Sequence, residues 1–118
     1  RPFRLNEKGA LEVHFAPALA GSLFTKKAEK ATLWIGGRQK TVELPAHSYS
    51  FSFLGNTLVT YHNPLRRNTF GARGVKPVLW KITGSDGKVV VVKGNAVGGP
   101  LARAIRDRKV SRIEIELG

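Results

Sequence analysis

The sequence contains no cysteine and no methionine, and only eight of its 118 residues are Asp or Glu. The absence of cysteine excludes disulfides, thiolate metal ligands and thiol nucleophiles, so redox chemistry does not indicate the compartment. No apolar run approaches the roughly 20 residues that a membrane helix needs. We therefore expect a soluble protein whose stability comes from packing. We also expect a cytoplasmic location, which the cysteine content does not decide.

The amino end reads Arg1-Pro2-Phe3, and there is no methionine that could be a translation start. The length suits one domain with one hydrophobic core. We therefore expect residues 1–118 to form a single domain that is a fragment of a larger protein.

The charge is lopsided, with 20 Lys and Arg residues and a formal net charge of +12. No acidic residue lies between Glu43 and Asp86. That stretch predicts a positive surface, which either binds an anion or has lost an acidic neighbour of the parent chain. Its basic residues are Arg66, Arg67, Arg73, Lys76 and Lys81.

Alternation of apolar and polar residues with a period of two predicts many short strands. In residues 49–53, three aromatic side chains share one face opposite two serines, a pattern that no helix of period 3.6 gives. The other predicted strands are residues 11–15, 31–35, 39–44, 58–62, 78–83, 89–93 and 112–117.

Glycine-containing turns join these strands into hairpins. Gly36-Gly37, Gly55-Asn56 and Ser85-Asp86-Gly87 each separate two predicted strands and contain the residue types that tight turns favour. Residues 94–100 are predicted as a turn that leads into one helix of about two turns, over residues 101–107. The predicted fold is an all-β, antiparallel, jelly-roll-like β-sandwich with one short helix near the C-terminus.

Residues that could carry chemistry are few. His14, His47 and His62 do not have the spacing of a metal motif, and no serine lies in a nucleophile elbow. We predict no catalytic residue, no metal site and no cofactor. Trp34, Tyr61 and Trp80 could stack on sugar rings, although we favour a place in the core or at a domain interface.

The segment Tyr61-His62-Asn63-Pro64-Leu65-Arg66-Arg67-Asn68-Thr69-Phe70-Gly71 is the most distinctive part of the chain. Together with residues 15–19 and 105–113, it resembles the carboxyl-terminal region of long bacterial glycoside phosphorylases related to cellobiose phosphorylase, in glycoside hydrolase family 94. The strand over residues 49–54, followed by Gly55, is similar to the strand that precedes the His-Asn-Pro loop of those enzymes.

The resemblance implies that this chain is the non-catalytic, carboxyl-terminal β-sandwich of a larger enzyme, packed against an (α/α)6 catalytic barrel. The parent enzyme would use inorganic phosphate to cleave or form a β-glucosidic bond, with inversion and without a cofactor. Its catalytic acid has no counterpart here. The partners implied are the barrel, a second subunit, and for the parent inorganic phosphate and a β-glucoside. The loop expected at an interface or anion contact contains His62, Asn63, Arg66 and Arg67.

Two other functions remain open at this stage. A carbohydrate-binding module would expose at least two of Trp34, Tyr61 and Trp80 in one row or groove. A basic nucleic-acid-binding β domain would bind in a strongly salt-dependent way, because counterions are released. We expect no membrane partner.

Overall fold

Ten strands, one α-helix and one 3₁₀ helix make up this computed structural model, which describes all residues from Arg1 to Gly118. The helices are α1 (Gly99–Arg106) and η1 (Gly21–Leu23). The strands are β1 (Phe3–Leu5), β2 (Leu11–His14), β3 (Glu29–Ile35), β4 (Arg38–Leu44), β5 (Ser48–Phe53), β6 (Thr57–His62), β7 (Pro77–Gly84), β8 (Val89–Lys93), β9 (Ala96–Gly98) and β10 (Val110–Leu117).

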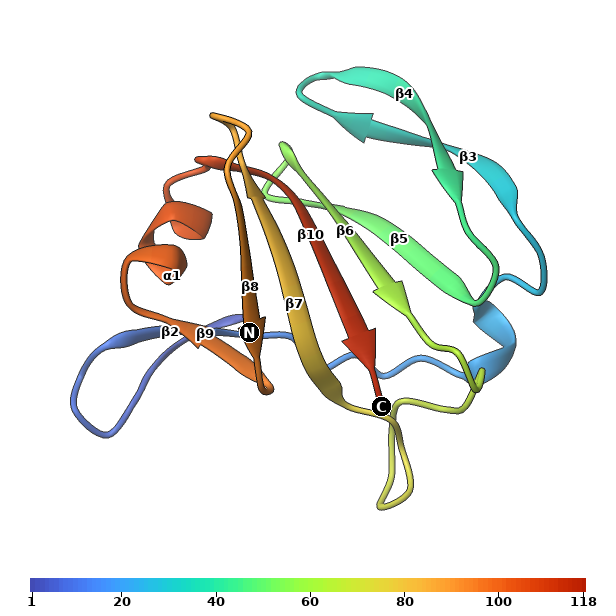
Figure 1. Ribbon diagram of the computed structural model, residues 1–118, viewed down its shortest axis with the longest axis horizontal. Coiled ribbons are helices and arrows are strands. Elements are labelled where there is room, and N and C mark those ends of the chain that lie inside the picture. Colours follow the sequence, from blue (N-terminus) through green and yellow to red (C-terminus); the bar gives the residue numbers. More distant parts are fainter.

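The strands form a five-stranded sheet in the order β5-β6-β10-β7-β8, a three-stranded sheet in the order β1-β2-β9, and the two-stranded sheet β3-β4. The three-stranded sheet and α1 cover one face of the five-stranded sheet (Figure 1). The predicted class, an all-β sandwich with one short helix near the C-terminus, is confirmed. No helix has the length and apolar character that crossing a membrane requires.

The three predicted hairpins, β3-β4, β5-β6 and β7-β8, all form. One pairing departs from the antiparallel expectation, because β10 lies between β6 and β7 and runs parallel to β6. The prediction also missed β1 and β9. These strands have three residues each, too few for an alternating pattern to stand out, and β9 falls in the stretch predicted as a turn.

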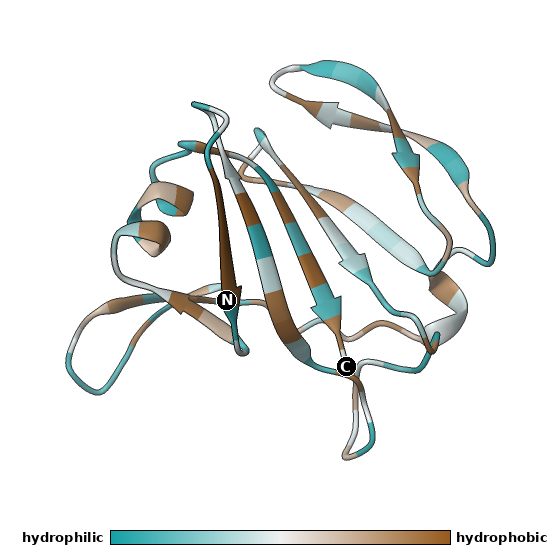
Figure 2. Cartoon of the chain, viewed as in Figure 1, coloured by the Kyte–Doolittle hydropathy of each residue, from teal (hydrophilic) through white to brown (hydrophobic).

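Alternation within the strands separates a core face from an outer face. In β10, Ile113 and Ile115 are fully buried, while Glu114 and Glu116 point to the opposite face. Figure 2 shows this alternation as brown and teal bands along β10. Pairing with β6 and β7 places Val59 and Ile82 beside Ile113, so the apolar faces of three strands coincide.

The core is an aromatic and aliphatic cluster of 15 buried residues between the sheets and α1. Phe15, just after β2, lies at its centre. Its ring centroid is 5.1 Å from that of Phe53, 5.6 Å from Trp80 and 6.0 Å from Phe51. The indole Nε1 of Trp80 donates a hydrogen bond to the Gly94 carbonyl at 3.1 Å, so this buried donor is satisfied. The aromatic face predicted for β5 therefore packs against the second sheet.

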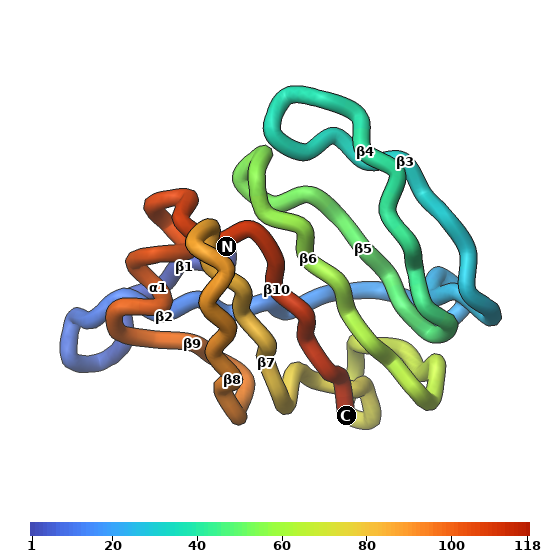
Figure 3. The backbone as a smooth tube through the Cα atoms, turned by 45° about the horizontal axis from the view of Figure 1, so that its top comes forward, coloured from blue at the N-terminus to red at the C-terminus, as the bar shows by residue number.

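The β3-β4 hairpin extends beyond β5 at one edge of the molecule (Figure 3). The Gly36 N–H in its turn donates to the Gly55 carbonyl at 2.7 Å, which ties it to the β5-β6 turn. Ile35 and Leu44 are buried on the inward face of the hairpin, and Trp34 lies on its opposite face. The hairpin thus carries an exposed tryptophan away from the core.

Candidate functional site: a basic loop held by polar side chains

The loop that follows β6, residues 63–76, begins with a turn fixed by Asn63. The Arg66 N–H donates to the Asn63 carbonyl at 2.9 Å, and Pro64 occupies the turn position that proline favours. The Asn63 side chain is fully buried; its Nδ2 donates to the Arg67 carbonyl at 2.7 Å and its Oδ1 accepts from the Arg67 N–H at 3.3 Å. One amide side chain therefore sets the path of the next four residues.

A second polar residue, Thr69, fastens the middle of the loop to the segment after β2. Its buried hydroxyl donates to the Pro17 carbonyl at 2.7 Å and accepts from the Leu19 N–H at 2.8 Å. The Asn68 Oδ1 accepts from the Gly21 N–H at 2.8 Å. Residues 15–19 and 61–71, two of the segments on which the suggested resemblance was based, are therefore bonded to each other.

Close approach of two backbones completes this attachment. A Cβ at Gly21 would collide with the carbonyl of Arg66, so only glycine fits there. Arg66 itself has φ of 45°, a left-handed conformation that is uncommon for a residue other than glycine. Its guanidinium Nε and Nη2 both donate to the Phe24 carbonyl, at 3.2 and 3.1 Å. The backbone at the base of the loop is thus fixed, and the Arg66 guanidinium is held against it.

These side chains surround a shallow pocket of about 510 Å³. Its lining contains three arginines and no carboxylate, and consists of Arg66, Arg67, Asn68, Phe70, Arg73 and Gly74. Arg67 and Arg73 are exposed and make no side-chain ion pair within the chain. Guanidinium groups recognise carboxylates and phosphates through paired donors. The pocket, which we call the arginine pocket, is therefore suited to an anionic group.

The structure divides the four residues that the sequence placed in this loop. Arg66 and Arg67 line the arginine pocket, and Asn63 is a buried support beneath it. His62 instead lies on the outer face of the sheet, with its Nε2 3.4 Å from Glu114 Oε1. Sequence reasoning noted Arg73 only as part of an acid-free stretch and did not select Phe70. The one signal for Arg73 was its place in the same basic stretch as Arg67, with Gly71 between them.

The outer face carries a second group of charges around Glu114. Lys81 Nζ lies 3.9 Å from Glu114 Oε2, and Arg112 Nη2 lies 3.5 Å from Glu114 Oε1. The Arg112 Nε is buried without a hydrogen-bond partner. Arg112 and Leu58 also form the floor of a groove of about 710 Å³ beneath the β3-β4 hairpin. Charges of both signs meet here, so this face is less selective for anions than the arginine pocket.

The three candidate sugar-stacking residues do not form a row. Tyr61 is 3% exposed and Trp80 is fully buried, whereas Trp34 is 62% exposed. Burial raises the pKa of the Tyr61 hydroxyl well above its usual range, so the hydroxyl stays protonated. The core position that we favoured is found for Tyr61 and Trp80, and Trp34 lies on the surface. The condition set for a carbohydrate-binding module, two exposed aromatics in one row, is not met.

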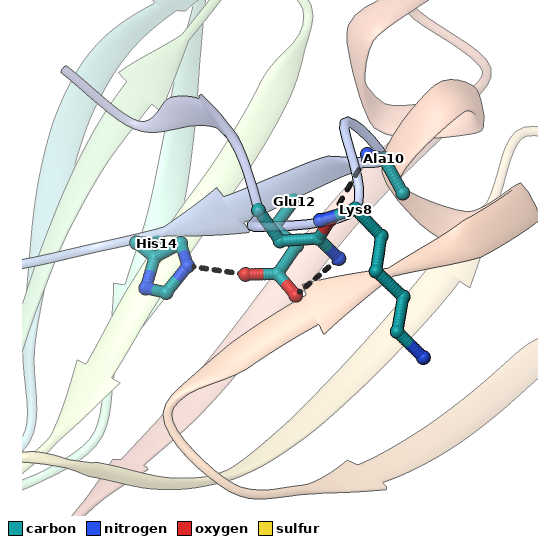
Figure 4. Close-up of polar contacts among 5 residues, drawn as sticks. Lys8, Ala10, Glu12 and His14 are labelled. Atoms are coloured by element: carbon teal, nitrogen blue, oxygen red, sulfur yellow. Dashed lines mark hydrogen bonds and ion pairs between the residues drawn. The ribbon is translucent and has the colours of Figure 1, made fainter.

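The remaining polar contact of note joins Glu12 to His14 in β2 (Figure 4). The His14 Nε2 lies 2.9 Å from Glu12 Oε1, and the Asn6 Nδ2 donates to Glu12 Oε2 at 3.2 Å. The hydrogen bond with His14, followed by that with Asn6, lowers the pKa of the Glu12 carboxyl.

The structure brings no three His, Asp or Glu side chains together in a group that could hold a metal ion.

No protein-family model matches this chain, and no curated protein matches it.

Proposed function

We propose that this chain is the non-catalytic, carboxyl-terminal β domain of a cytoplasmic enzyme like the family 94 glycoside phosphorylases, and that the loop over residues 63–76 docks on the catalytic barrel or on a second subunit. The parent enzyme uses inorganic phosphate to cleave or form a β-glucosidic bond. The chemistry is carried out in the barrel, and the β domain stabilises it.

The observation that carries this proposal is that residues 15–19 and 61–71, two segments on which the resemblance is based, are joined at one surface. The buried Thr69 hydroxyl links them, and the surface above this contact presents the arginine pocket. Leu65 and Phe70, which are 63% and 49% exposed, lie on the same loop. Exposed apolar side chains beside unpaired arginines are the composition of a protein interface with an acidic counterpart.

The test starts from the intact gene product of the source organism. We expect a polypeptide of several hundred residues that releases a sugar 1-phosphate from a β-glucoside only when inorganic phosphate is present, whereas residues 1–118 alone are inactive. A gene product no longer than this chain, or a longer one without phosphate-dependent activity, would overturn the proposal.

A pair of variants in the intact protein tests the docking surface separately. Arg67→Ala with Arg73→Ala removes two exposed guanidiniums from the loop, and Lys26→Ala with Lys40→Ala makes the same charge change at exposed sites elsewhere. We expect only the arginine variant to lower the melting temperature of the intact enzyme and to speed proteolysis between the domains. Equal effects of the two variants would place the interface elsewhere.

A second function, binding of nucleic acid, is favoured by one observation, the arginine pocket on a chain with net charge +12. It predicts that this chain binds single-stranded DNA, and that the affinity falls by orders of magnitude between about 50 and 200 mM salt. Fluorescence anisotropy with a labelled oligonucleotide measures this. Weak binding that Arg67→Ala with Arg73→Ala does not change would reject this function.

A further inference from the structure

The five-stranded sheet ends in an open edge at β8. This strand pairs with β7 and with no other strand of the chain. Four of its five residues are valines, and Val89, Val90 and Val91 are 51%, 40% and 59% exposed. Figure 2 shows β8 as a continuous brown strand at the margin of the sheet. Proteins usually shorten, twist or cover such apolar edges, because an unpaired strand accepts another.

The hydrogen bonds at the two ends of β8 show which backbone groups are free. The Gly84 N–H donates to the Lys88 carbonyl at 2.8 Å, and the Gly94 N–H donates to the Val78 carbonyl at 2.9 Å. Bonding alternates along an antiparallel pair. Residues 88, 90, 92 and 94 therefore bond to β7, and the N–H and C=O groups of Val89, Val91 and Lys93 point away from the sheet.

An apolar groove of about 440 Å³ lies beside this edge, between β8 and α1. Val90 lines it from the strand, Leu101 and Ala104 line it from the helix, and Ile82 and Val110 lie among its other walls. Figure 1 shows α1 next to β8 at the side of the sheet where a sixth strand would add. Inward side chains of such a strand would therefore enter the groove.

We propose that this edge and groove bind an extended polypeptide segment of another protein, which adds to the sheet as a sixth strand beside β8. Backbone hydrogen bonds to Val89, Val91 and Lys93 hold the segment, and its alternate apolar side chains pack on Val90, Leu101 and Ala104. This combination of a free edge and a neighbouring hydrophobic groove is how β-strand addition obtains both affinity and specificity.

The charges around the groove identify the occupant as an apolar segment with acidic flanks. Lys88 and Lys93 stand at the two ends of β8, and Lys109 lines the groove. The one carboxylate there, Asp86, accepts a hydrogen bond from the Lys88 N–H at 3.0 Å within the turn. A second copy of this chain is disfavoured, because two molecules of charge +12 repel each other.

The proposed site does not depend on the function proposed above. The groove lies at the β7-β8 turn, whereas the arginine pocket lies at the opposite end of the sheet, near the C-terminus (Figure 1). The two surfaces can therefore be tested one without the other, and failure of one leaves the other standing.

The experiment uses residues 1–118 and a short fluorescent peptide in which valines alternate with threonines and two glutamates stand at each end. Val91→Pro removes one outward N–H without touching a bond to β7, and Val91→Thr is its control because it keeps the N–H and the branched shape. A third variant, Ala104→Leu, places a larger apolar side chain in the groove. Leucine is also a good helix former, so α1 should be kept.

We expect saturable binding of the peptide, weakened at least about tenfold by Val91→Pro and by less than about twofold by Val91→Thr. Ala104→Leu should weaken it severalfold, and a peptide with lysines in place of the glutamates should bind at least about tenfold more weakly. No saturation at millimolar peptide, or equal binding by the proline variant, would overturn the proposal. So would a β8-dependent dimer in sedimentation experiments without peptide binding, because the occupant would then be a second copy.

Discussion

The core of the sandwich and the basic loop hold their shapes by different means. In the core, Phe15 and Trp80 are ordered by apolar contact over a large area, spread across two sheets and a helix. In the loop, Asn63 and Thr69 set the backbone through a few hydrogen bonds each. Apolar packing spreads its contribution over many contacts, whereas the loop depends on a few individual hydrogen bonds. The shape of the loop is therefore specified by fewer residues than that of the core.

Phenylalanines at the two sites give the largest contrast. Phe15→Ala should lower the free energy of unfolding by about 3–5 kcal/mol, because a cavity opens among buried rings. The matched change Phe70→Ala, on a half-exposed ring, should change it by about 0.5 kcal/mol or less. Urea denaturation followed by tryptophan fluorescence measures both. Similar losses at the two positions would mean that the loop packs as a core.

Removing the amide that sets the turn tests the loop by itself. Asn63→Ala leaves the partly buried Arg67 N–H and C=O without their Asn63 side-chain partner and should cost about 1–3 kcal/mol of unfolding free energy. Asn95→Ala, at an exposed asparagine, is the control. Hydrogen exchange should rise in residues 64–69 of the first variant and leave β10 protected. Exchange that rises evenly through the chain would show that loop and core unfold together.

The arginines should separate binding from stability. Arg67→Ala with Arg73→Ala should change the free energy of unfolding by about 0.5 kcal/mol or less, because both side chains are exposed and unpaired. Sulfate should raise the melting temperature of the native chain by binding the arginine pocket, and this rise should shrink in the variant. An unchanged sulfate effect would argue that the anion binds at the outer face around Arg112.

The smallest effect concerns Glu12 in β2, which belongs to the three-stranded sheet. The pKa of the Glu12 carboxyl in the folded protein is lowered by the hydrogen bond with His14 and then by that with Asn6. The ionised carboxyl therefore stabilises the fold above the unfolded pKa of about 4.5, and this stabilisation is lost as pH falls through the folded pKa. The melting temperatures of the native chain and Glu12→Gln should therefore converge as pH falls from about 4.5 through the folded pKa. Glu7→Gln, which removes the charge of an exposed glutamate, is the control. A Glu12 carboxyl that titrates at 4.5 or above in NMR would contradict this cause.

Features of the fold that depend on neighbouring residues could be predicted from the sequence, whereas features that depend on contacts between distant residues could not. The alternating aromatics of β5 and the glycines between paired strands are local signals, so strands and hairpins could be placed from sequence. The position of β10 between β6 and β7 depends on contacts far apart in the chain, which no local pattern reveals. Periodicity places Trp34 on the strand face opposite Leu33 and Ile35, but it does not reveal that this face of the hairpin is left uncovered.

Only the part of the candidate site that has a local sequence signal was predicted. Arg66 and Arg67 stand next to each other in sequence and were selected from the motif. Arg73 reaches the same pocket only because Asn68 and Thr69 fold the intervening chain back on residues 17–21. Phe70 was overlooked because a single aromatic in a polar loop has no periodic partner. Side-chain bonds to distant backbone are the part of a site that sequence reasoning misses most easily.

The central place of β10 also bears on how the protein matures on the ribosome. The hairpins β5-β6 and β7-β8 are made early, but neither can join the other until residues 110–117 have left the exit tunnel, because β10 bonds to both. Until then the core faces of β6 and β7, which carry Val59 and Ile82, lack the strand that lies between them and stay exposed. Those intervals of synthesis are when a nascent chain attracts chaperones. A pause in translation before β10 would prolong the exposure, and one after it would give the sheet time to close.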